Sequence, residues 1–149
     1  MRARAPCRHQ GQPVRVGPYT VWAAGGNSIS DACVDEMDVL VTLGGFLPIY
    51  EDTGVKMILW YPVKDYKGPP ENWRQYLEEE VIPLLKAGKK LAVFCFAGHG
   101  RTGLFIASLI ALLEDPAETP DPIRALRKRY CDRAVETLVQ EAAVLALRG

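Results

Sequence analysis

The sequence has no net charge and no long hydrophobic run. Its 149 residues carry eighteen basic and eighteen acidic side chains, which cancel. A neutral chain creates no strong field toward nucleic acid or anionic lipid, so we expect no nucleic acid as a partner. The most apolar run, residues 103–113, is too short to cross a bilayer, which takes about 20 residues. We therefore expect no membrane insertion.

Cysteine is scarce and widely spaced. The four cysteines, Cys7, Cys33, Cys95 and Cys131, form no Cys-x-x-Cys pair and show no cysteine–histidine spacing of the zinc type. This argues against a disulfide framework and against a metal site, and it is typical of reduced thiols in the cytoplasm. The basic start of the chain lacks the apolar stretch of a secretory signal. We predict that residues 1–13 form a flexible basic tail.

Short apolar runs alternate with helical patterns along the rest of the chain. The apolar runs predict a strand or a hairpin interrupted by Gly17-Pro18 at residues 14–22, and strands at residues 37–43, 55–63 and 91–96. Periodic apolar positions predict helices at residues 72–86, 102–113, 122–130 and 133–147. Pro83 is expected to kink or end the first of these helices. The prediction is one α/β domain over residues 14–149, with a mostly parallel central sheet flanked by helices on both sides.

One loop between a predicted strand and a predicted helix is suited to anion binding. It reads Phe94-Cys95-Phe96-Ala97-Gly98-His99-Gly100-Arg101-Thr102-Gly103. In such a loop, successive backbone N–H groups and the helix N-terminus surround a bound oxyanion. Arg101 can bind two phosphate oxygens through its guanidinium fork. We expect Cys95, at the base of the loop, to be a thiolate that attacks phosphorus and forms a phosphocysteine intermediate.

The pattern Cys-x5-Arg followed by Thr-Gly resembles the signature of the protein tyrosine phosphatase superfamily. In the form CFAGHGRTG it resembles the dual-specificity branch, and the resemblance extends over roughly residues 37–147. It implies the cysteine-dependent protein phosphatase fold. It also implies a phosphate-binding loop made of Phe96, Ala97, Gly98, His99, Gly100 and Arg101. The hydroxyl of Thr102 is placed to donate to the thiolate and to help the cysteine leave in the second step.

Two more residues match functional positions of that family. Asp65 follows an apolar strand about thirty residues before Cys95, where the family carries its general acid on a mobile loop. Gln140, in the segment AVETLVQ, matches the glutamine that positions the hydrolytic water. The resemblance thus implies that Asp65 acts first as acid and then as base. From the residues alone, Asp65 also suits a polar turn, and Gln140 a solvent-facing helix position.

Three residues carry open questions. Phe94 stands where the family usually has a histidine that orients the loop and tunes the thiol, so we expect a slower or differently tuned enzyme. His99 either contacts substrate from the rim of the loop or merely occupies a permitted position. Cys33 is either an inert buried thiol or a partner for Cys95 in a protective disulfide.

The favoured function is a protein phosphatase that acts on phosphotyrosine and, through a shallow pocket, also on phosphoserine and phosphothreonine. One alternative is a phosphoinositide or RNA-triphosphate phosphatase, which the absence of lysine from the loop disfavours. The other is a phospho-ligand-binding pseudophosphatase, which only Phe94 supports. We expect phosphorylated proteins as partners, a monomer, and no metal or organic cofactor, since phosphoryl transfer through cysteine needs none.

Overall fold

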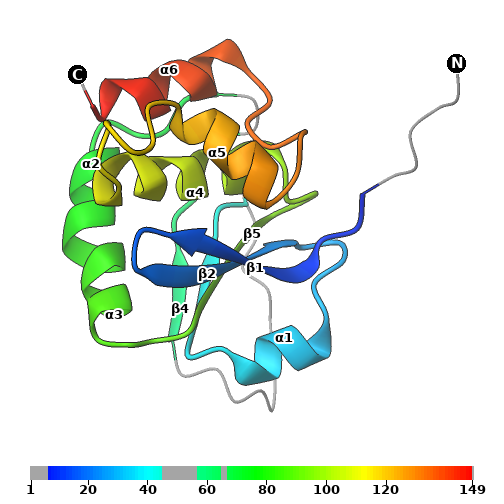
Figure 1. The fold of residues 1–149 in the computed structure, drawn as a ribbon. Helices are drawn as coiled ribbons and strands as arrows, with labels where there is room; N and C mark the ends of the chain where they lie inside the picture. The colour runs from blue at the N-terminus through cyan, green and yellow to red at the C-terminus, as the bar shows by residue number, and fades with distance from the viewer. Residues whose placement is uncertain (1–6, 45–56, 65–66, 149) are drawn as a thin grey trace, which may run out of the picture.

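A five-stranded sheet forms the centre of the protein (Figure 1). The computed structural model describes residues 7–44, 57–64 and 67–148. The strands are β1 (Gln10–Val16), β2 (Tyr19–Gly25), β3 (Val39–Thr42), β4 (Met57–Trp60) and β5 (Leu91–Cys95), arranged in the order β1-β2-β5-β3-β4. Strands β1 and β2 form an antiparallel hairpin, and the three other pairings are parallel. This confirms the predicted α/β class and mostly parallel sheet.

Helices cover both faces of the sheet, as predicted. On one face lies α1 (Asp31–Glu36), whose Cys33 and Val34 pack in a small apolar cluster with Phe94 of β5. The other face carries α2 (Trp73–Tyr76), η1 (Leu77–Val81), α3 (Ile82–Lys86), α4 (Gly100–Leu113), α5 (Pro122–Arg129) and α6 (Leu138–Ala146). Helix α4 is buried from residue 100 to residue 111, because the sheet, α5 and α6 all pack around it. None of the described helices has the length and apolar character needed to cross a bilayer.

The predicted helix at residues 72–86 continues through Pro83. Its middle turn, η1, is a wide π-helical turn in which the N–H of Ile82 donates to the carbonyl of Leu77. Pro83 has no N–H to donate, and it occupies the first turn of α3, where proline is tolerated. The chain therefore accommodates the proline by widening the turn before it.

The predicted tail is wrong for residues 7–13. Strand β1 begins at Gln10, and His9 just before it is buried at 7% exposure. Pro13 is compatible with this strand because β1 lies at the edge of the sheet. The Gln12 side chain also donates to the carbonyl of Tyr130, which joins the strand to the end of α5. Residues 1–6 lie outside the described part of the chain.

The last helix begins five residues later than predicted, at Leu138. Thr137 is its N-cap, and the Thr137 hydroxyl and the Gln140 side chain each accept a backbone N–H of the other residue in a capping box. Val135, two residues before the cap, has φ +63°, which a helix cannot continue through. The pattern Thr-x-x-Gln is a start signal that the sequence already contained.

Candidate active site

Cys95 is the last residue of β5, at the carboxyl end of the parallel strands. Its side chain is only 3% exposed. The Thr102 hydroxyl oxygen accepts the Cys95 backbone N–H at 3.0 Å and lies 3.2 Å from the Cys95 sulfur. The same oxygen is 3.4 Å from the carbonyl of Ala24, so its single proton has two acceptors within reach. A negative charge on the sulfur would draw that proton toward Cys95.

Backbone carbonyls of the loop that follows Cys95 point outward, toward the groups that surround the loop. Four loop carbonyls accept hydrogen bonds from surrounding groups: Cys95 from Gly26, Phe96 from Asn27, Gly98 from the Tyr130 hydroxyl, and His99 from Gly103 and Val135. No described peptide bond is cis, and in a trans peptide the C=O and the following N–H point in opposite directions. The N–H groups of residues 96, 97, 99 and 100 are therefore directed into the loop. Together with the N-terminus of α4, N–H groups directed in this way are suited to an oxyanion, and we call this part of the loop the cradle.

Gly98 makes the tight part of this loop possible. Its φ is +84°, and a Cβ there would lie 2.9 Å from both the Ala24 carbonyl oxygen and the Tyr130 hydroxyl. Tyr130 is buried, which raises the pKa of its phenol, so the hydroxyl stays protonated and donates to the Gly98 carbonyl at 2.6 Å. Tyr130 was missed by the sequence analysis, because it closes a predicted helix and belongs to no motif.

Arg101 lies in the first turn of α4, directly after the cradle. It is 8% exposed, and its Nη1 donates to the carbonyl of Val63 at 3.4 Å. Val63 comes two residues before Asp65, which itself lies outside the described residues. After that gap, a Cβ on Gly68 would lie 3.0 Å from Val139 in the first turn of α6. The described residues before and after position 65 thus lie next to α4 and α6, and both helices border the loop.

Gln140 is fully buried, so it does not face solvent. Its Oε1 accepts the backbone N–H groups of Glu136 and Thr137 at 2.8 and 3.3 Å. Its Nε2 is buried without a hydrogen-bond partner among the described residues. A Cβ on Gly100 would lie 3.1 Å from that nitrogen, which places the Gln140 amide beside the first turn of α4. A free amide donor at this place is compatible with holding a water.

Phe94 and Cys95 point to opposite faces of the sheet, as successive strand residues do. Phe94 is fully buried on the α1 side in an apolar cluster that includes Met37 and Cys33. It therefore contributes packing and no hydrogen bond to the loop. Cys33 lies on that face too, where burial raises the pKa of its thiol. This arrangement supports the inert buried thiol for Cys33 and speaks against a disulfide with Cys95.

His99 points away from the rim of the loop. It is 8% exposed, and its Nε2 lies 3.1 Å from Nε2 of His9, with the two rings in an edge-to-face arrangement. Burial lowers the pKa of both imidazoles, which favours their neutral forms. The rim contact considered for His99 is not what the structure shows: the side chain packs against the segment that precedes β1.

Comparisons of sequence place the chain near two proteins without an assigned function. The uncharacterised proteins MJ0215 and MJECL20 of Methanocaldococcus jannaschii are 33% and 32% identical to it over 87 residues, which is 58% of this chain. The chain matches 52% and 56% of their lengths, so the match spans about half of each relative. No protein-family model matches the chain.

Comparisons of structure identify the fold. The kinase associated phosphatase, in a form with its catalytic-site cysteine replaced by serine, aligns with a TM-score of 0.77 at 16% identity and covers 98% of this chain and 96% of that one. Tk-PTP in its active form gives 0.70 at 22%, with 92% and 96% covered. Human DUSP28 gives 0.68 at 13%, with 97% of each chain covered. The chain has the fold of the protein tyrosine and dual-specificity phosphatases.

Proposed function

We propose that this chain is a cysteine-dependent phosphatase of the dual-specificity type, which hydrolyses phosphotyrosine and also phosphoserine and phosphothreonine in proteins. One observation supports the proposal: four loop carbonyls accept hydrogen bonds from groups around the loop, so the N–H groups of the following residues face the opposite way, as binding of an oxyanion would require. The phosphatase fold of the structural neighbours supports it.

In the first step, Cys95 is the nucleophile. Three phosphoryl oxygens enter the cradle of loop amides, and Arg101 neutralises their charge through its guanidinium group. The Cys95 sulfur forms a bond to phosphorus while the bond to the leaving oxygen breaks. Asp65 donates the proton that the leaving oxygen requires. The product is a phosphocysteine and a free alcohol or phenol.

In the second step, water replaces the sulfur. Gln140 holds the water through its buried amide, and Asp65 accepts the proton as the oxygen attacks. The sulfur–phosphorus bond breaks and Cys95 leaves as a thiolate. The Thr102 hydroxyl donates a hydrogen bond to that charge. Inorganic phosphate is then released.

The test is hydrolysis of p-nitrophenyl phosphate by the wild type, Cys95→Ser and Cys33→Ser. Cys33→Ser is the matched control, because it removes a buried thiol on the opposite face of the sheet. We expect turnover by the wild type and the control, and none by Cys95→Ser. Vanadate, which resembles the transferring phosphoryl group, should inhibit competitively.

Substrate class is tested by comparing phosphotyrosyl, phosphoseryl and phosphothreonyl peptides with a phosphoinositide and an RNA 5′-triphosphate. The proposal expects the highest kcat/KM for the phosphotyrosyl peptide. Preference for the phosphoinositide or the RNA would support the corresponding alternative. Tight binding of a phosphopeptide with no turnover would contradict the proposed enzymatic activity and would support a phospho-ligand-binding module.

A further inference from the structure

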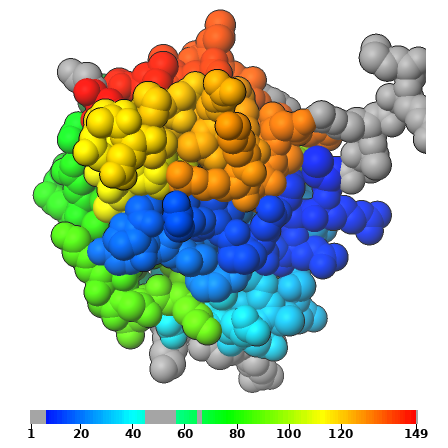
Figure 2. Space-filling model, viewed as in Figure 1, coloured from blue at the N-terminus to red at the C-terminus, as the bar shows by residue number. Residues whose placement is uncertain are grey.

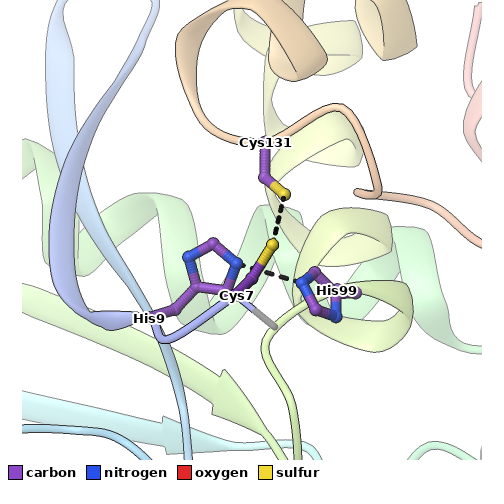
Figure 3. Close-up of side chains that lie close together, drawn as sticks. All are labelled: Cys7, His9, His99 and Cys131. Atoms are coloured by element: carbon purple, nitrogen blue, oxygen red, sulfur yellow. Dashed lines mark hydrogen bonds between the residues drawn. The ribbon is translucent and has the colours of Figure 1, made fainter. Parts of the chain in front are cut away.

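Four thiol and imidazole groups from three distant segments of the chain meet beside the phosphate-binding loop (Figure 3). Cys7 and His9 precede β1, His99 belongs to the loop, and Cys131 follows α5. We call these four residues the Cys2His2 cluster. Their sulfur and ring nitrogen atoms all lie within 4.8 Å of one another, and three of the four residues are buried. In Figure 3 the four side chains converge on one point.

Two distances within the cluster are close to those of a tetrahedral zinc site. Zinc binds sulfur at about 2.3 Å and imidazole nitrogen at about 2.0–2.1 Å. A tetrahedron with those bonds separates its two sulfurs by about 3.8 Å and its two nitrogens by about 3.4 Å. The structure has the sulfurs of Cys7 and Cys131 3.9 Å apart and the Nε2 atoms of His9 and His99 3.1 Å apart.

The chemistry of the four groups selects the same ion. Two thiols and two imidazoles with tetrahedral spacing are the donor set typical of zinc, whereas magnesium and calcium require oxygen ligands. The two thiols do not form a disulfide, whose sulfurs would lie about 2.05 Å apart.

We propose that Cys7, His9, His99 and Cys131 bind one zinc ion in a closed tetrahedral site. Four protein ligands leave no open coordination position, so the ion is structural and takes no part in phosphoryl transfer. From the sequence we expected no metal, because its cysteines and histidines show no spacing of the zinc type. The structure brings the four ligands together from three segments, and Cys7 and Cys131 are separated by 124 positions.

The zinc would fasten the segment before β1 and the segment after α5 to the phosphate-binding loop. His99 lies between Gly98 and Gly100, so fixing its ring also fixes the peptides that form the cradle. Tyr130, next to Cys131, packs on the His9 ring with centroids 4.6 Å apart and donates to the Gly98 carbonyl. In Figure 2 the blue N-terminal segment lies against the orange surface that follows α5. The site thus joins three segments that are distant in the sequence.

The direct test is metal analysis of the full chain, purified without a histidine tag in a thiol-free reductant. The Cys95→Ser background removes the candidate nucleophile as a competing ligand. We expect about one zinc per chain. After zinc removal, added Co²⁺ should give the intense visible bands of a tetrahedral ion together with thiolate-to-metal charge transfer. These readouts do not depend on phosphatase activity, so they test the zinc site independently of the proposed function.

Ligand variants sharpen this test. Cys7→Ser and Cys131→Ser should lower zinc affinity by roughly two orders of magnitude or more. Cys33→Ser is the matched control and should bind zinc as the parent does. Equal zinc binding by Cys7→Ser and the control would overturn the proposal, and so would a cobalt spectrum without thiolate charge transfer.

If a ligand variant fails to fold, measurements on the parent chain still test the zinc site. There, zinc should protect Cys7 from alkylation by iodoacetamide, and a strong chelator should restore its reactivity, as mapped by mass spectrometry. Equal alkylation with and without zinc would contradict the site. If a Cys7–Cys131 disulfide persisted in the presence of both reductant and zinc, the two cysteines would be a redox pair and not zinc ligands.

Discussion

The Thr102 hydroxyl oxygen lies 3.2 Å from the Cys95 sulfur and 3.0 Å from the Cys95 backbone nitrogen. One oxygen therefore accepts from the backbone of the proposed nucleophile and donates toward its side chain. The bond to sulfur strengthens as negative charge builds up there, which occurs when Cys95 leaves the phosphocysteine.

Thr102→Val removes this hydroxyl with little change in volume, and Thr102→Ser keeps it. A hydrogen bond to a charged group contributes about 1.5–3 kcal/mol, so we expect the valine variant to lose about 10- to 100-fold in the rate of phosphocysteine hydrolysis. Rapid-mixing kinetics with p-nitrophenyl phosphate should show a burst of nitrophenol followed by slow turnover. The serine variant should behave as the wild type. A valine variant with unchanged steady-state rate and no burst would contradict this role.

Gly98→Ala should damage the cradle. The new Cβ would meet the Ala24 carbonyl and the Tyr130 hydroxyl, and φ of +84° already disfavours a side chain. Gly88→Ala is the matched control, because Gly88 has φ +79° but open space around its Cβ position. We expect both variants to lose about 1 kcal/mol of unfolding free energy from backbone strain. Only Gly98→Ala should also weaken vanadate binding by more than about tenfold; equal vanadate affinities in the two variants would argue against the cradle.

Gln140 has a structural and a proposed catalytic role, which two substitutions separate. Thr137→Ala removes the N-cap of α6 and should lower the unfolding free energy by about 1 kcal/mol while kcat stays near the wild-type value. Gln140→Leu removes the capping contact as well as the buried amide, and should in addition slow phosphocysteine hydrolysis. Urea unfolding and rapid-mixing kinetics report the two effects. If both variants lose kcat in proportion to stability, Gln140 acts only through the fold.

Stability should fall in acid through Glu114. Hydrogen bonds from Arg129 are the main cause that lowers the pKa of Glu114 from its ordinary 4.5 to about 2, with Thr119 and the backbone N–H of Gly17 adding to them. Because the folded-state pKa is the lower one, the stabilisation is full above pH 4.5 and is lost as the pH falls toward 2. Glu114→Gln should therefore cost about 2–3 kcal/mol at pH 7 and much less near pH 2. Urea unfolding at both values measures this, and a difference independent of pH would contradict it.

The sequence predicted the sheet and the central helix because their signals are local. Leu91 to Cys95 is a run of apolar residues that ends in the Cys-x5-Arg motif, and α4 follows it directly. The start of α6 was placed too early because Val135 adopts a left-handed conformation. The Arg127 side chain of α5 stabilises that conformation by donating to the carbonyls of Ala134 and Val135 in the connection to α6. The sequence does not reveal this tertiary contact, although its Thr-x-x-Gln pattern marks the start of the helix.

The residues of the candidate site also divide into those that share one local motif and those that only tertiary packing brings together. Cys95, Arg101 and Thr102 lie within eight positions, so their mutual geometry follows from one loop and one helix turn. Tyr130 and His9 reach the loop only through tertiary packing, and neither belongs to a recognisable motif. The Cys2His2 cluster is the extreme case, since its members come together only when the segments before β1 and after α5 pack against the loop.

The most direct test of the central claim is to trap the covalent intermediate. Wild-type protein is mixed with p-nitrophenyl phosphate, quenched rapidly in acid, digested and analysed by mass spectrometry. We expect one phosphoryl group on the peptide that contains Cys95, more of it in Thr102→Val, and none in Cys95→Ser. Turnover without any phosphorylated Cys95, or a phosphoryl group on a different residue, would contradict it.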